Sequence, residues 1–135
     1  MIVVDTNIIS YLFIPGQQTE VVKQILTKDS DWIAPILWRS EFRSVLSLYI
    51  RKKHLTVQQA KFLIQEAEDM MVDSEYEVNS GNVLELVNKS KCSSCDCEFI
   101  ALAEDIDVPL VTRDKKILSE FPSKAISAEE FLLIS

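Results

Sequence analysis

Residues 1–7 read MIVVDTN, and this stretch decides how the rest of the sequence is interpreted. Its first four residues form a short apolar run rich in β-branched side chains, which predicts a buried strand. The charge of Asp5 ends that run, and Asp5-Thr6-Asn7 offers polar side chains that suit the start of a helix. We therefore expect a strand that passes directly into a helix at about residues 8–13.

The same alternation of short apolar strands with helices continues along the chain. Strands that are covered on both faces read as continuous apolar runs, as these do. We therefore expect an α/β fold with a central parallel β-sheet flanked by α-helices. The expected strands are at 32–34, 70–72, 109–112 and 125–126. The expected helices are at about 19–28, 36–52, 56–67, 78–89 and 94–105. Two further short helices are expected, one just after Asp114 and one at the C-terminus.

Length and composition fit one domain over residues 1–135. Hydrophobic residues make up 47% of the chain, which is enough for a sizeable core. The N-terminus lacks the basic start and long apolar stretch of a secretory signal. No run approaches the roughly 18 apolar residues that a membrane helix requires. A cytoplasmic protein without a membrane segment is expected.

The charge balance argues against simple binding to nucleic acid. Lysine and arginine number 14 against 21 aspartates and glutamates, which gives a net charge of −7. Affinity for a phosphate backbone usually rests on basic charge. A bound divalent metal ion could offset the acidity locally, because such an ion is often the largest charge in its site.

Three cysteines, Cys92, Cys95 and Cys97, lie within six residues. An odd count at this spacing does not predict a disulfide framework. Structural zinc sites are usually four-coordinate, and the sequence offers no obvious fourth ligand. Oxidation beside Asp96 would be a regulatory alternative. The interpretation that we favour is small, semi-buried residues at a helix start.

Two aspartates follow predicted strands directly. Asp5 comes after the strand at 1–4, and Asp114 comes just after the strand at 109–112. Open parallel sheets bind ligands outside the carboxyl ends of their strands, so both acids lie where function is expected. Each could equally serve as the N-cap of the helix that follows it.

Two further acids lie on predicted apolar helix faces. Glu41 has Trp38 three positions before it and Val45 four positions after it, and Asp96 has Phe99 three positions after it. A carboxylate on such a face costs several kcal/mol unless it is paired or bound to metal. The alternatives are an edge position that reaches water or, for Asp96, a helix cap.

The four acids together predict a metal site. If the helices start near the strand ends, all four carboxylates can converge there and will repel one another. Mg²⁺ or Mn²⁺ removes that repulsion, because hard cations prefer carboxylates, water and phosphate. Such an ion can polarise a phosphodiester and deliver hydroxide, which makes phosphodiester hydrolysis the natural reaction.

Four motifs carry a resemblance to a known family. They are VVDTN at 3–7, WRSEF at 38–42, CDCEFIALA at 95–103 and VTRD at 111–114. Their order and spacing resemble those of PIN domains, especially the VapC-type toxins, over nearly the whole chain. The three cysteines depart from the small or aromatic residues usual there.

The resemblance implies a ribonuclease that depends on Mg²⁺ or Mn²⁺ and forms a homodimer. It also implies a small antitoxin protein that inhibits the enzyme, as in a type II toxin–antitoxin pair. Asn7 could equally be only a turn former. The resemblance places catalytic and metal-binding acids at Asp5, Glu41, Asp96 and Asp114, and supporting polar residues at Thr6, Asn7 and Thr112.

Basic residues adjoin one of the proposed ligands. Arg113, Lys115 and Lys116 flank Asp114 and could guide RNA phosphates towards the metal. The alternative is an ordinary solvated helix face.

Two other functions fit parts of the pattern. The chain could be a PIN-like interaction module without catalysis, although it has all four acids. It could also be a phosphatase-like domain in which Asp5 forms an aspartyl phosphate. Haloacid-dehalogenase-like phosphatases, however, have a second aspartate two residues later, where this chain has Asn7.

Overall fold

A computed structural model describes residues 1–134 of the chain. Within this range no helix is both long and apolar enough to cross a membrane. The elements are β1 (Ile2–Val4), α1 (Thr6–Phe13), α2 (Thr19–Lys28), β2 (Trp32–Pro35), α3 (Trp38–Arg51), α4 (Val57–Met71), β3 (Glu75–Tyr76), α5 (Ser80–Asn88), α6 (Ser94–Ile106), β4 (Leu110–Thr112), α7 (Lys115–Glu120), β5 (Ala125–Ser127) and α8 (Ala128–Leu133).

The strands form one sheet in the order β3-β2-β1-β4-β5, and every neighbouring pair is parallel. The chain moves outward from β1 to β2 and β3, then returns to place β4 and β5 on the other side of β1. Strand order therefore reverses beside β1, the point at which open parallel sheets leave a crevice for ligands. Val4 pairs with Val111, so Asp5 and Thr112 leave the sheet side by side.

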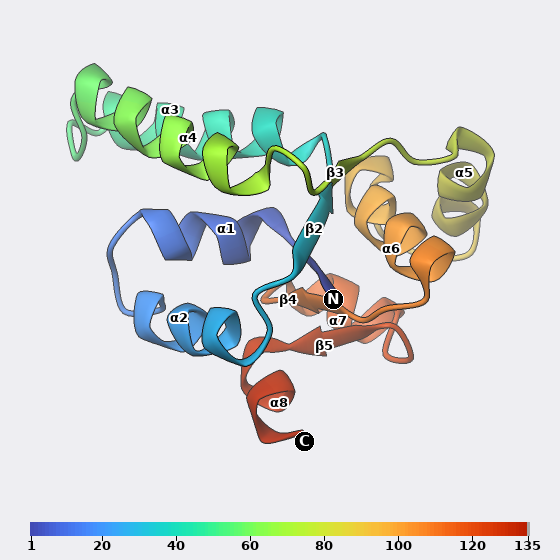
Figure 1. Ribbon diagram of the computed structural model, residues 1–135. Helices are drawn as coiled ribbons and strands as arrows, with labels where there is room; N and C mark the ends of the chain where they lie inside the picture. The colour runs from blue at the N-terminus through green and yellow to red at the C-terminus, as the bar shows by residue number, and fades with distance from the viewer. Residues whose placement is uncertain (135) are drawn as a thin grey trace.

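Helices cover both faces of the sheet, which confirms the predicted α/β architecture (Figure 1). The helices α1 to α4 lie on one side, and α5 and α6 lie on the other. On the first side, the Phe42 ring lies 6.2 Å from the ring of Trp38 and 6.5 Å from that of Phe13, which joins α3 to α1. On the second side, α6 packs across β1, β2 and β4. The two helices that carry Glu41 and Asp96 are thus fixed on opposite faces of the sheet.

The strand predicted at 70–72 is wrong, because these residues end α4 or follow it directly. A capping box at Thr56 starts this helix, and its buried face continues at helical spacing through Ala60, Ala67 and Met71. The strand in this region is β3, a two-residue edge strand of Glu75 and Tyr76. Its polar sequence carries no apolar run, so sequence patterning does not reveal it.

A partly buried ion pair fixes β3 to α3. Glu75 accepts hydrogen bonds from Arg39 Nε at 2.6 Å and from Trp38 Nε1 at 2.7 Å, and its side chain is only 8% exposed. The bonds from Arg39, together with its charge, lower the pKa of Glu75 despite the opposing effect of burial. Arg39 thus has a structural role at the sheet edge, even though it is one of the cations on the helix that bears Glu41.

Candidate active site

Asp5 lies at the centre of the polar cluster beyond β1 and β4. It is 7% exposed, and its Oδ2 accepts a 2.7 Å hydrogen bond from Thr112 Oγ1. Its Oδ1 accepts a 2.7 Å bond from the backbone N–H of Thr6, so Asp5 is also the N-cap of α1. The capping role and the site role therefore coincide in one side chain.

Asn7 joins the two strand ends. Its amide nitrogen lies 3.4 Å from Asp5 Oδ2 and 3.5 Å from Thr112 Oγ1. Its Oδ1 accepts a 3.2 Å hydrogen bond from the backbone N–H of Arg113. Asn7 is therefore more than a turn former, because it connects the loop after β1 to the loop after β4.

Glu41 reaches the same cluster from α3. Thr6 Oγ1 donates a 2.6 Å hydrogen bond to Glu41 Oε1, which ties α3 to the start of α1. Burial raises the pKa of Glu41, the bond from Thr6 opposes that rise, and the negative charges of Asp96 and Glu98 add to it. Glu41 is thus held half-buried among other acids, as its apolar helix neighbours predicted.

Asp96 approaches from the opposite face of the sheet. It lies in the first turn of α6, where Ser93 is the N-cap and its Oγ accepts a 3.1 Å bond from the Asp96 N–H. Asp96 is therefore not the cap residue, and its carboxylate is not needed to start the helix. The negative charge of Asp96 raises the pKa of both Asp5 and Glu41, so the three acids share one electrostatic environment.

The environment of Asp5 disfavours its charged form. Burial raises the pKa of Asp5 from its ordinary 3.8 to about 7, against the lowering effect of the hydrogen bonds from Thr112 and Thr6. The charges of Glu41 and Asp96 raise it further. A divalent cation would remove this penalty by supplying the missing positive charge.

Asp114 is placed differently from the other three acids. It is the N-cap of α7, and its Oδ1 accepts a 3.0 Å bond from the Ile117 N–H. Its own backbone N–H donates to Thr112 Oγ1 at 3.0 Å, which connects it to the cluster. The capping alternative is therefore satisfied for Asp114, and its metal role stays a prediction.

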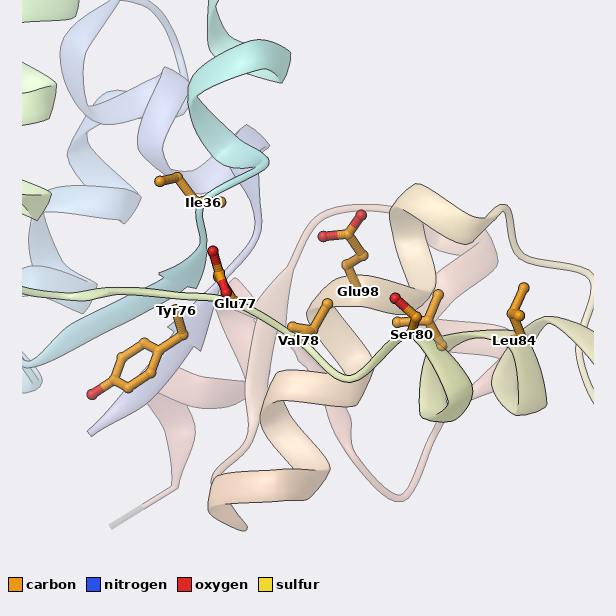
Figure 2. Close-up of a pocket in the computed structure, with 8 residues that line it drawn as sticks. Ile36, Tyr76, Glu77, Val78, Ser80, Leu84 and Glu98 are labelled. Atoms are coloured by element: carbon orange, nitrogen blue, oxygen red, sulfur yellow. The ribbon is translucent and has the colours of Figure 1, made fainter.

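Glu98 is a further acid of this region, and it is not among the residues predicted from sequence. Burial raises its pKa, and its charge raises the pKa of Glu41. The sequence carries a signal for Glu98 of the kind used for Glu41 and Asp96, an acid on an apolar helix face, because Ala101 and Leu102, three and four positions later, are apolar. Figure 2 shows Glu98 on α6, facing a groove of about 410 Å³ that Ile36 also lines.

The cations near Asp114 divide into two kinds. Arg113 forms a 2.8 Å ion pair with Glu129, and its guanidinium carbon lies 6.0 Å from the centre of the Tyr11 ring. Lys115 and Lys116 are exposed, and neither takes part in an ion pair within residues 1–134. The two lysines are thus free to meet a phosphate, whereas Arg113 is already engaged.

The three cysteines are free thiols of different exposure. Cys92 and Cys97 are buried, and Cys97 Sγ lies 3.9 Å from the Ser90 hydroxyl, whereas Cys95 is exposed. This placement fits the interpretation of small packed residues at a helix start for two of the three.

The donor set suits a hard cation. Within the described part of the chain, no group of three or more histidine, cysteine, aspartate or glutamate side chains is arranged so that it could hold a metal ion. Mg²⁺ does not need such a group, because it usually keeps several waters and takes one or two carboxylates plus substrate phosphate. Asp5, Glu41 and Asp96 are the candidates for those one or two carboxylates.

Thr112→Val is expected to destabilise the protein by about 1–3 kcal/mol, because it removes a buried hydroxyl with two strong partners. The bond that this hydroxyl donates also lowers the pKa of Asp5, so that pKa should rise further in the variant. Urea unfolding at pH 7 measures the stability. Thr112→Ser keeps the hydroxyl and is the control, and a Val variant as stable as wild type would show that these bonds contribute little.

The fold and this cluster define an α/β domain with an acidic site at the switch point of its sheet. Residues 2–123 match the family described as the PIN domain, so the chain belongs to the PIN domain family. The family expected from the four motifs is therefore confirmed. PIN domains are generally nucleases.

Solved structures share this fold at low sequence identity. PAE2754 from Pyrobaculum aerophilum aligns with a TM-score of 0.78 and 17% identity, over 98% of this chain and 93% of that one. FitAcB from Neisseria gonorrhoeae aligns with a TM-score of 0.71 and 19% identity, over 94% and 96%. FitAB bound to the IR36 DNA fragment aligns with a TM-score of 0.71 and 17% identity, over 100% and 98%. At these identities the likeness concerns the fold alone.

One curated protein matches part of the sequence. The mouse (Mus musculus) "Glycosyltransferase 6 domain-containing protein 1" is 34% identical over 67 residues, which is 49% of this chain. The chain spans about a fifth of that protein, since the match covers 20% of its length.

Proposed function

We propose that this chain is a ribonuclease that depends on Mg²⁺ or Mn²⁺. The observation that carries the proposal is that Asp5, Glu41 and Asp96 come from three different elements, and that the charges of Glu41 and Asp96 raise the pKa of Asp5 while the charge of Asp96 raises that of Glu41. Such a group is costly without a counter-ion, so a purely structural role explains it poorly. Membership of a family whose members are generally nucleases supports the same reaction class.

The residues divide between holding the metal and orienting its ligands. Asp5, Asp96, Glu41 and Asp114 are the proposed ligands of Mg²⁺ or Mn²⁺, of which one or two would bind the ion directly and the others would act through its waters. When bound, the ion would supply Lewis-acid catalysis for the phosphodiester and the attacking water. Thr112 and Thr6 hold the Asp5 and Glu41 carboxylates by the hydrogen bonds described above. Asn7 fixes the two loops relative to each other.

Partners and location belong to the same proposal. By resemblance to VapC-type toxins, the protein would form a homodimer in the cytoplasm and be inhibited by a small antitoxin protein. One solved relative is described as FitAB bound to a DNA fragment, so DNA is a necessary comparison substrate. Light scattering of the purified chain tests the dimer.

The experiment compares cleavage of a structured RNA and of a DNA of matched sequence in Mg²⁺, in Mn²⁺ and in EDTA. Cleavage of the RNA with either metal, and its loss in EDTA, is expected. Asp96→Asn should lower the rate of RNA cleavage at least about 100-fold, because it removes a proposed metal ligand. Asp105→Asn is the matched control, since Asp105 is exposed at the far end of the same helix.

The remaining outcomes separate the alternatives. Equal cleavage by wild type and Asp96→Asn would contradict the proposed site. Faster cleavage of the DNA than of the RNA would show that DNA, and not RNA, is the substrate class. Failure of both metals to bind would favour the non-catalytic interaction module, and phosphate covalently attached to Asp5 would favour the phosphatase-like domain.

A further inference from the structure

One carboxylate on the edge strand β3 holds the first turn of the helix that carries Glu41. Glu75 Oε2 accepts hydrogen bonds from Trp38 Nε1 at 2.7 Å and from Arg39 Nε at 2.6 Å. Glu75 Oε1 accepts a third bond, from Arg39 Nη2 at 2.7 Å. Trp38 and Arg39 are the first two residues of α3, and Glu41 lies in the same turn. A side chain of β3 thus fixes the segment from which Glu41 reaches the acidic cluster.

The start of α3 depends on β3 for its position. The N-cap residue is Leu37, whose apolar side chain cannot accept a hydrogen bond from the first N–H groups of the helix. The connection from β2 is instead held by the backbone N–H of Ile36, which donates to the carbonyl oxygen of Tyr76 at 3.0 Å. Figure 1 shows β3 beside this junction of β2 and α3. The Glu75 carboxylate and this backbone bond are therefore two anchors from the same short strand.

Arg39 lies where a cation is electrostatically unfavourable. It is the second residue of α3, and the positive end of the helix dipole lies there. Two carboxylates compensate for this, Glu75 and, at 3.4 Å from Arg39 Nη1, Glu68 Oε1 of α4. Ion pairs that are partly withdrawn from water often add little net stability, whereas a bidentate pair fixes geometry. The geometry that the pair imposes on α3 therefore explains it better than the stability that it adds.

The second contact that positions Glu41 is at its carboxylate. Thr6 Oγ1 donates a 2.6 Å hydrogen bond to Glu41 Oε1. This bond forms only if the first turn of α3 presents the carboxylate at the right place. Groups in a working site must be held within about 0.5 Å, and a displacement of about 1 Å can cost about 100-fold in rate. A looser first turn would therefore weaken whatever Glu41 does in the site.

We propose that Glu75 and Arg39 are positioning residues of the acidic site, which act on the metal ion through Glu41 and contact neither the ion nor the RNA. The fork of parallel N–H···O bonds between them sets how α3 leaves the sheet. The inference rests on the proposed function for the reaction, but metal binding tests it without any cleavage. It assigns to the edge strand control over an ion that binds at the centre of the sheet.

The first measurement is Mn²⁺ affinity without RNA, from the electron paramagnetic resonance signal of the free ion. Arg39→Lys keeps the charge but loses the fork, and it should weaken Mn²⁺ binding about fivefold. Glu75→Gln keeps one acceptor oxygen of two and should weaken it about tenfold. With RNA and Mn²⁺ present, both variants should lower kcat about tenfold while KM stays within about twofold.

A double-mutant cycle separates positioning from a general effect on the fold. Glu41→Gln alone should weaken Mn²⁺ binding, because it removes a proposed ligand. Adding Arg39→Lys to Glu41→Gln should cause no further loss, since both changes act through the same side chain. This pair of variants decides the matter if Glu75→Gln does not fold.

Two control variants match the changes at Arg39 and Glu75. Glu68→Gln removes only the longer contact of Arg39 and leaves its bonds to Glu75, so Mn²⁺ affinity should stay within about twofold of wild type. Phe131→Leu opens a cavity under α8, beside β5 at the opposite edge of the sheet. It should lower stability in urea and leave Mn²⁺ affinity unchanged, which shows what loss of stability alone does.

The outcomes distinguish this inference from the proposed nuclease. Wild-type Mn²⁺ affinity in folded Arg39→Lys and Glu75→Gln would overturn the inference and leave the nuclease in place if RNA is cleaved. A loss as large in the Glu41→Gln background as in wild type would also overturn it. A loss that disappears in that background, without cleavage of RNA, would support the inference and reject the nuclease. Absence of Mn²⁺ binding by wild type would reject both.

Discussion

Asp5→Asn is expected to lower RNA cleavage at least about 100-fold and, in the same protein, to raise the stability of the metal-free state. Cleavage falls because an amide is a far weaker ligand for Mg²⁺ than a carboxylate. Stability rises because burial and two neighbouring acids oppose the charge at this position. A residue whose removal stabilises the fold but abolishes function has been retained for its chemistry.

The gain in stability has an upper bound. A pKa raised from 3.8 to about 7 corresponds to roughly 4 kcal/mol, at about 1.4 kcal/mol for each tenfold change in proton affinity. The asparagine keeps an oxygen for the Thr6 N–H but presents an amide where Oδ2 accepted from Thr112 and Asn7, so the Asn7 contact is lost and the Thr112 bond must reverse its direction. We therefore expect a gain of about 2 kcal/mol at pH 8 in EDTA.

Urea unfolding and RNA cleavage of the same preparations provide the measurement. Asp31→Asn is the matched control, since Asp31 is exposed and its substitution should change neither quantity. Cleavage within tenfold of wild type would rule out Asp5 as an essential ligand. An Asp5→Asn variant less stable than wild type would show that the hydrogen bonds to Asp5 outweigh its burial.

The features predicted from sequence are those with a local signal. The apolar runs of β1 and β4 identified buried strands, and their parallel pairing brought Asp5 to the edge where the predicted site lies. Glu41 was predicted from the apolar neighbours on its own helix, and the structure shows it half-buried against Thr6. In each case the deciding pattern lies within a few residues in sequence.

The features that were missed depend on contacts between distant residues. The edge strand β3 is fixed by the pairing of Glu75 with Arg39, 36 positions away, and not by an apolar run. The engagement of Arg113 by Glu129 could not be foreseen either, because it requires the register of β4 against β5. Charge partners of this kind are decided by tertiary structure, so sequence alone does not reveal that Arg113 has an ion-pair partner.

The metal-free protein is expected to lose stability as the pH rises from about 4 to about 7. The folded state binds a proton at Asp5 throughout this range, whereas the unfolded chain, with a pKa near 3.8, does not. The free energy of unfolding therefore falls with pH, by up to roughly 4 kcal/mol, and levels off above the folded pKa. The raised pKa of Glu41 acts in the same direction. The lowered pKa of Glu75 acts in the opposite direction, but only at more acidic pH.

Divalent metal should reverse this loss, because Mg²⁺ binds the charged acids of the folded state only. At ten times its Kd, the ion adds about 1.4 kcal/mol to the free energy of unfolding, and the addition grows as Asp5 ionises. Urea unfolding at pH 5, 6, 7 and 8, with EDTA or with Mg²⁺, should give a falling curve that the metal flattens. Asp5→Asn should keep only the part of the slope that Glu41 contributes, and a wild-type slope that matches the variant would mean that Asp5 does not titrate in this range. A metal effect equal at pH 5 and pH 8 would instead locate the binding ions away from these acids.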